Sequence, residues 1–101
     1  DYYSPYMLVT STVKEEWKTK IPTVVHVDGS SRFQSVTLNS NERFYKLIES
    51  FYKSTGVPVL LNTSFNGPHE PMVETPLDAI SCMNQRNIDH LVIGNYIISR
   101  F

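Results

Sequence analysis

The sequence predicts one small domain over residues 1–101, of the α/β (α+β) class, with a mixed β-sheet and two main helices. Residues 41–55 repeat apolar side chains at helical spacing, and residues 57–61 form a continuous apolar run of strand length. Near the C-terminus, two apolar segments flank Gly94 and Asn95, a pair typical of a two-residue hairpin turn. With 41% hydrophobic residues, the 101-residue chain has enough apolar material for one thin core.

The first forty residues favour strands. Residues 6–10 are predicted to form a strand, and the polar stretch 11–20 a loop or a short exposed turn of helix. Residues 21–28 are rich in β-branched side chains and are predicted to form a buried strand. Pro22 marks the start or an edge of that strand, because proline cannot donate to a ladder. A turn should follow, and residues 33–38 are the expected return strand.

Two helices have clear sequence signals. Four apolar residues form one face of the first helix and are interpreted as core: Phe44, Leu47, Ile48 and Phe51. Gly56 stands where a left-handed C-terminal cap is expected, and the apolar run that follows should be a strand buried on both faces. Thr75 and Pro76 begin the second helix, as N-cap and first helical residue, and that helix should end near Arg86.

Composition excludes several classes of protein. Nine Lys and Arg residues face ten Asp and Glu residues, so there is no basic surface for nucleic acid. No apolar run approaches the roughly 20 residues of a membrane span. The single cysteine, Cys82, allows no internal disulfide and is interpreted as a small buried apolar residue. These features fit a cytoplasmic protein, and the start at Asp1, without Met, suggests a piece of a longer chain.

The first candidate site is the turn that follows residues 21–28. His26 and Asp28 should share one face of the strand, and Gly29 begins a turn whose backbone N–H groups are expected to be free. Arg32 lies just beyond, and a guanidinium beside free amides suits a carboxylate or a phosphate. The alternative is an ordinary hairpin turn with a solvated Arg32.

The second candidate site is the loop that begins at Asn62. It follows a predicted buried strand, which is where open α/β sheets place their ligand crevices. Its short polar side chains suit phosphate oxygens, a ribose or a metal-bound water, and Gly67 lets the backbone approach a ligand: Asn62, Thr63, Ser64 and Asn66. The alternative is a loop whose polar groups only satisfy the local backbone. His69 and Glu70 are adjacent, and we interpret them as ordinary loop residues rather than as an acid–base pair or metal ligands.

Five strings in order along the chain resemble one known family: Ser4-Pro5-Tyr6-Met7, residues 21–36, residues 55–66, residues 70–79 and residues 89–95. The most specific are His-Val-Asp-Gly at residues 26–29 and Asn-Thr-Ser-Phe-Asn at residues 62–66. They resemble the carbamoyltransferases of the nodulation protein U and antibiotic O-carbamoyltransferase family. The resemblance covers the last part of the C-terminal, YrdC-like domain.

The resemblance implies a function in two parts. In this family a YrdC-like domain forms carbamoyl-adenylate from carbamoyl phosphate and ATP with Mg²⁺. An N-terminal transferase domain, which binds iron and the acceptor, then passes the carbamoyl group to an acceptor hydroxyl. Ser64 and Asn66 match a Ser-x-Asn motif that lies near the phosphates, and Asn62 and Thr63 belong to the same string. Arg32 would be a charge-stabilising cation, and the iron would not be bound by this chain.

The chain also departs from the family pattern. Ser30 and Ser31 replace a usual Thr-Ala pair, and His69 stands where a glycine is common. A basic segment expected just before Ser4 is missing, so the chain should hold about half of the YrdC-like domain. We expect the isolated chain to be inactive and its partner to be the transferase domain of the parent chain. The alternatives are a non-catalytic nucleotide- or anion-binding module and a structural segment that packs on the transferase domain.

Overall fold

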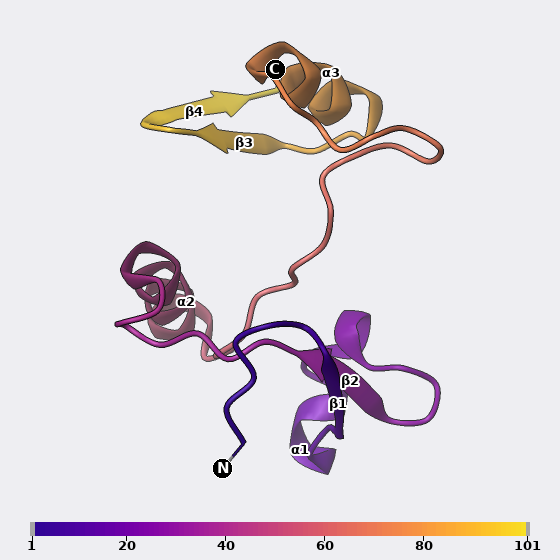
Figure 1. The fold of residues 1–101 in the computed structure, drawn as a ribbon, viewed down its shortest axis with the longest axis vertical. Coiled ribbons are helices and arrows are strands. Elements are labelled where there is room, and N and C mark those ends of the chain that lie inside the picture. Colours follow the sequence, from indigo (N-terminus) through magenta and orange to yellow (C-terminus); the bar gives the residue numbers. More distant parts are fainter. Residues whose placement is uncertain (1, 101) are drawn as a thin grey trace. The chain divides into compact units, whose positions relative to one another are not determined.

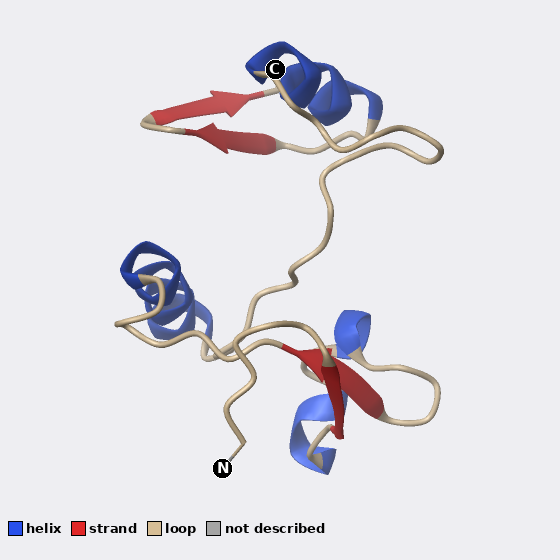
Figure 2. Cartoon of the chain, viewed as in Figure 1, coloured by secondary structure: helices blue, strands red, loops and turns tan. Residues whose placement is uncertain are grey.

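A computed structural model describes residues 2–100 and separates them into two compact units, residues 2–61 and 62–100 (Figure 1). The predicted α+β class is confirmed, because helices and antiparallel strands occur in both units (Figure 2). The strands differ from the expected mixed sheet. Those of the described residues form two separate antiparallel pairs, one in each unit.

In the first unit, β1 (Val9–Thr12) pairs with β2 (Ser30–Phe33). The register places Val9 opposite Phe33 and Thr12 opposite Ser30. Both strands are displaced from their predicted positions. The sequence predicts the first over residues 6–10, and β1 begins at Val9. It predicts the return strand over residues 33–38, whereas β2 ends at Phe33. The partner of β2 is β1 and not the segment before the turn.

The buried strand predicted over residues 21–28 is wrong. Pro22–Val24 forms one turn of 3₁₀ helix, in which Val25 N–H donates to the Pro22 carbonyl at 3.2 Å. Val27 is fully exposed. Proline fixes φ near −65°, which suits this turn, and β-branched composition cannot form a strand where no partner strand lies alongside.

The helices of the first unit follow their local signals. The polar stretch contains α1 (Glu15–Lys18), and the predicted long helix is α2 (Glu42–Thr55). The Asn41 side chain accepts from Phe44 N–H at 3.1 Å, and Gly56 ends α2 in the left-handed conformation. However, no residue of α2 is buried, so its apolar face is not the core that the sequence predicts.

The strand predicted over residues 57–61 is also wrong. The structure assigns these residues no regular secondary structure, and Val59 and Leu61 are 40% and 59% exposed. A strand buried on both faces needs neighbouring strands to bond with and layers to pack against. Neither β-pair of the described residues includes this segment.

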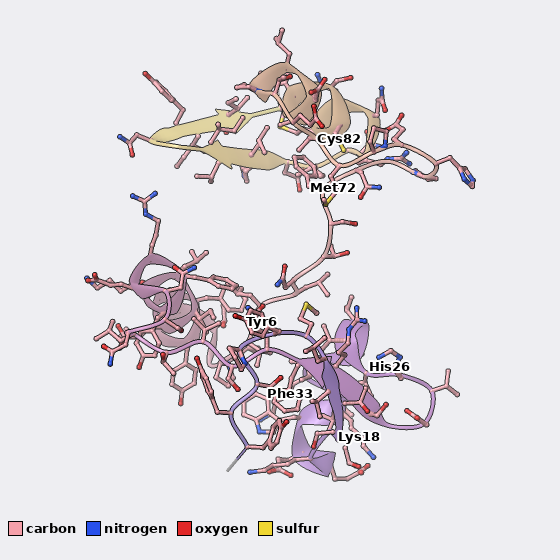
Figure 3. All side chains as sticks on the ribbon, viewed as in Figure 1. Tyr6, Lys18, His26, Phe33, Met72 and Cys82 are labelled. Carbon is pink, nitrogen blue, oxygen red and sulfur yellow. The ribbon has the colours of Figure 1, made fainter. Side chains whose placement is uncertain are left out.

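The second unit matches its prediction closely. It contains α3 (Pro76–Gln85) and a hairpin of β3 (His90–Ile93) and β4 (Tyr96–Ser99), joined through Gly94 and Asn95. The side chains of Thr75 and Asp78 form a capping box at the start of α3. Contacts between α3 and β3 accompany a small core, made of three buried side chains from α3: Ala79, Cys82 and Met83. The burial of Cys82, labelled in Figure 3, confirms its apolar interpretation.

None of the helices among residues 2–100 combines the length and the apolar character needed to cross a lipid bilayer.

Candidate functional site

The turn at Asp28 closes on itself. Gly29 N–H donates to the His26 carbonyl at 2.9 Å, and His26 N–H donates to the Ser30 carbonyl at 2.7 Å. The Ser30 N–H and hydroxyl both donate to Asp28 Oδ1, at 2.9 and 2.7 Å. Two of the backbone amides expected to be free, those of Gly29 and Ser30, therefore already have acceptors. The turn therefore offers an anion fewer free N–H donors than the sequence predicts.

Electrostatics at this turn follow from the same contacts. The Ser30 hydroxyl and then the Ser30 N–H hold the pKa of Asp28 below its ordinary value, and the charge of His26 acts in the same direction. Partial desolvation opposes them. His26 and Asp28 are thus electrostatic neighbours, although the expected strand that would have put them on one face is absent. Arg32 lies in β2 opposite Thr10 and is exposed.

A cation that the sequence does not single out lies at this turn. Lys18 comes from α1, and a Cβ built on Gly29 would stand 3.2 Å from its Nζ (Figure 3 labels Lys18 and His26). Lys18 Nζ also pairs with Glu15 Oε2 at 2.7 Å. Gly29 has a φ of +81°, a conformation in which glycine is favoured. Glycine thus serves both the backbone of the turn and the approach of Lys18.

The loop of the second unit is closed by Asn66. Its Nδ2 donates to the Glu70 carbonyl at 2.9 Å and to the Gly67 carbonyl at 3.2 Å, while Gly67 N–H donates to Glu70 Oε2 at 3.1 Å. Val73 N–H donates to the Phe65 carbonyl at 3.0 Å and completes the closure. The amide hydrogens of Asn66 are therefore used within the loop, and its immediate role is to shape that loop.

The hydroxyl side chains just before Asn66 have a different environment. Thr63 and Ser64 are exposed, and within residues 2–100 the structure records no hydrogen bond to either hydroxyl. Asn62 is also exposed and does have an interaction of its own. The loop thus presents two available hydroxyl groups next to a backbone that its own side chains hold in place.

His69 adopts a left-handed backbone conformation, with φ at 63°. Glycine reaches this region at no steric cost. Histidine can occupy it, but at an energetic cost of about 1 kcal/mol. The Glu70 side chain is committed to Gly67, which agrees with the interpretation that His69 and Glu70 are not a catalytic pair.

A second cation, Arg86, reaches this loop. Arg86 caps the C-terminal end of α3, and a Cβ built on Gly67 would collide with its Nη2. The sequence places these two residues 19 positions apart and gives no signal that they meet. Only the packing of the end of α3 against the loop brings the guanidinium there.

No group of three or more His, Cys, Asp or Glu side chains is placed to hold a metal ion within the described range, residues 2–100. The hydroxyl and guanidinium groups described above suit phosphate oxygens rather than a cation.

Comparison with known proteins decides the family. The sequence model described as carbamoyltransferase C-terminus matches residues 1–100. The chain belongs to this family. Its residues 62–66 and 26–32 are thus parts of a carbamoyltransferase C-terminus, as their sequence strings indicate.

Individual relatives agree with this carbamoyltransferase assignment. The chain is 41% identical over 96 residues to nodulation protein NolNO of Sinorhizobium fredii, and these residues are 95% of the chain and 14% of that protein. It is 44% identical over 98 residues to an uncharacterized protein of Methanocaldococcus jannaschii, covering 97% of the chain and 19% of that protein. It is 47% identical over 62 residues to nodulation protein U of Rhizobium tropici, covering 61% and 11%. The chain thus spans a fifth or less of the length of these relatives.

Proposed function

We propose that this chain is a segment of a carbamoyltransferase and contributes phosphate-binding groups to a site that forms carbamoyl-adenylate. ATP with Mg²⁺ and carbamoyl phosphate are the proposed ligands. The acceptor hydroxyl, and the iron expected beside it, belong in this proposal to an N-terminal transferase domain of the parent chain. The observation that supports the proposal most is the family match over residues 1–100, combined with the exposed hydroxyls of Thr63 and Ser64.

Each residue has a role that follows from its contacts. Ser64 and Thr63 donate hydroxyl hydrogen bonds to phosphate oxygens, which a closed loop can do without reorganising. Asn66 holds the loop by bonding to Glu70 and Gly67, so it acts as a positioning residue. Asn62 begins the same string and borders the ligand.

The turn of the first unit supplies charge. Arg32 is exposed on β2 and provides a guanidinium that stabilises phosphate or carboxylate oxygens. His26, Asp28 and Gly29 shape the turn, because their hydrogen bonds are made within it. Arg32 rather than these three residues contacts the ligand in this proposal, since the Asp28 carboxylate would repel an anion.

Catalysis of adenylate formation depends on positioning and on stabilising charge at the reacting phosphates. The first unit contributes one guanidinium and the second unit two hydroxyls, and neither set is sufficient for such catalysis. We therefore propose that residues 1–101 alone bind ATP weakly and do not catalyse the reaction. The activity requires the remaining cations of the parent enzyme.

ATP affinity of the longer parent enzyme tests the assignment. Ser64→Ala and Asn66→Ala should each weaken ATP binding several-fold, while Ser50→Ala, at an exposed position of α2, should leave it unchanged. Circular dichroism should show that the variants fold. Loss of ATP affinity in an enzyme that never forms an adenylate would instead favour a binding module. Unchanged affinity and unchanged activity in both loop variants would favour a structural segment that packs on the transferase domain.

A further inference from the structure

The second unit holds two cationic side chains among residues 62–100, and both lie at one end of α3. Arg86 caps the C-terminal end of the helix, where its N–H donates to the Cys82 carbonyl at 2.9 Å. Arg100 Nη1 donates to the side chain of Asn87, the next residue after Arg86, at 2.6 Å. In contrast, Asp78 lies at the N-terminal end of α3, where the capping box holds its carboxylate.

The two guanidinium groups differ in what they bind. Arg100 has the Asn87 oxygen as its acceptor. For Arg86, no hydrogen bond or ion pair joins the guanidinium to another residue of the range 2–100. The carbonyl end of α3 stabilises a nearby positive charge, and any rotamer of Arg86 would place its charge there. The loop accounts for the direction in which Arg86 points, because the Arg86 Nη2 and the Glu70 Oε2 both lie against the position of a Cβ built on Gly67, and the two charges attract each other.

That direction is toward Gly67. The guanidinium lies over the α-carbon of Gly67, in space that any side chain at this position would fill. Gly67 is buried and its φ is not positive, so glycine is favoured here by the approach of these side chains and not by the backbone conformation. Glu70 lies at the same α-carbon and accepts the Gly67 N–H at 3.1 Å.

We propose that Arg86 is an anion-binding residue of the Asn62–Gly67 loop and contacts a phosphate group held by the Ser64 and Thr63 hydroxyls. The planar guanidinium offers several donors in a fork that matches two oxygens of a phosphate. The adjacent Glu70 carboxylate repels the same phosphate, and so limits its affinity. The identity of the ligand rests on the function proposed above, whereas binding of inorganic phosphate at Arg86 does not.

A titration of the 101-residue chain with inorganic phosphate, followed by NMR, tests this proposal. We expect saturable shifts of the Arg86 Nε–H and Gly67 N–H signals at millimolar phosphate. Arg86→Ala should weaken phosphate binding about tenfold, the value of one charged hydrogen-bonding contact. Arg86→Lys keeps the charge at the helix end but loses the fork, and should weaken binding less. Arg43→Ala removes the same charge from an exposed position of α2 and should have no effect.

Two further variants separate this role from a structural one. Gly67→Ala should displace the guanidinium and weaken phosphate binding as Arg86→Ala does. Glu70→Gln keeps an acceptor for Gly67 N–H but removes the repulsive charge, so it should strengthen binding. With a merely structural contact, Gly67→Ala would leave phosphate binding unchanged and Glu70→Gln would not strengthen it.

The outcomes are distinguishable. Equal phosphate affinities for Arg86→Ala and Arg43→Ala, with weaker binding by Ser64→Ala, would overturn the role of Arg86 and leave the proposed function standing. No saturable shift in the unsubstituted chain would overturn the Arg86 proposal alone, because the function is proposed for the parent enzyme. Should Arg86→Ala fail to fold, Arg86→Lys and Glu70→Gln decide, since the proposal requires opposite changes in affinity from them.

Discussion

The two candidate loops each contain a glycine that lies beneath a cationic side chain from a helix, but they need glycine for different reasons. Gly29 has a φ of +81°, and Lys18 stands close to it without collision. Gly67 has no such backbone requirement, yet a side chain there would collide with Arg86 and Glu70. A turn signal in the sequence detects the first kind of glycine. The second kind depends on what packs against it.

The largest effect is expected at the turn of the first unit. Gly29→Ala should lower the free energy of unfolding by about 1–2 kcal/mol, because the Cβ of alanine is sterically strained in the left-handed conformation. Gly29→Asn should cost less, since asparagine tolerates that conformation better. Urea denaturation of the three proteins measures both values. If Gly29→Ala is not destabilising in a Lys18→Ala background, the loss of stability comes from the contact with Lys18 and not from the backbone conformation of residue 29.

Gly67→Ala should cost less, below about 1 kcal/mol, the value of one hydrogen bond, because the new Cβ displaces only the flexible ends of the Glu70 and Arg86 side chains. Here the cost should fall when Arg86→Ala is added, since one of the two colliding groups is gone. A double-mutant cycle on unfolding free energies measures this coupling. Strict additivity of the two substitutions would contradict the contact.

His69→Gly is expected to stabilise the second unit by about 0.5 kcal/mol. The substitution removes the strain of a left-handed histidine, and the greater conformational entropy of glycine in the unfolded chain offsets part of that gain. The matched control is His90→Gly, which lies in β3 and should lose stability instead. Thermal denaturation of both variants provides the comparison. A loss of stability in His69→Gly would imply a contact of the imidazole that its exposure does not suggest.

The smallest effect concerns pH. The hydrogen bonds from Ser30 lower the pKa of Asp28 below 3.8 in the folded chain. A carboxyl group with a lowered folded pKa stabilises the fold at pH above the unfolded value, and the contribution is lost as pH falls through the folded pKa. Ser30→Ala should therefore return the Asp28 pKa toward 3.8 and remove this part of the acid sensitivity. NMR titration of the Asp28 carboxyl carbon measures the shift, and an unchanged midpoint in Ser30→Ala would contradict the assigned cause.

How far the sequence predicts this molecule depends on the range of the interactions involved. The caps at Gly56 and Thr75 and the hairpin turn at Gly94 are determined within four residues, and they are confirmed. The strands at residues 21–28 and 57–61 are wrong, because a strand depends on partners that a local pattern cannot supply.

The same division applies to the candidate sites. The string at residues 62–66 is visible in the sequence. The internal bonds of Asn66 and the approaches of Lys18 and Arg86 are not, because each depends on how distant residues pack. Sequence thus identifies which loops to examine, and structure shows which side chains in them are available to a ligand.

Pyrophosphate exchange into ATP, dependent on carbamoyl phosphate, tests the central claim most directly. We predict exchange by the longer parent enzyme, at least tenfold slower exchange in its Ser64→Ala variant, and unaltered exchange in Ser50→Ala. We also predict none by residues 1–101 alone. Full exchange in Ser64→Ala, or exchange catalysed by the isolated chain, would contradict the account.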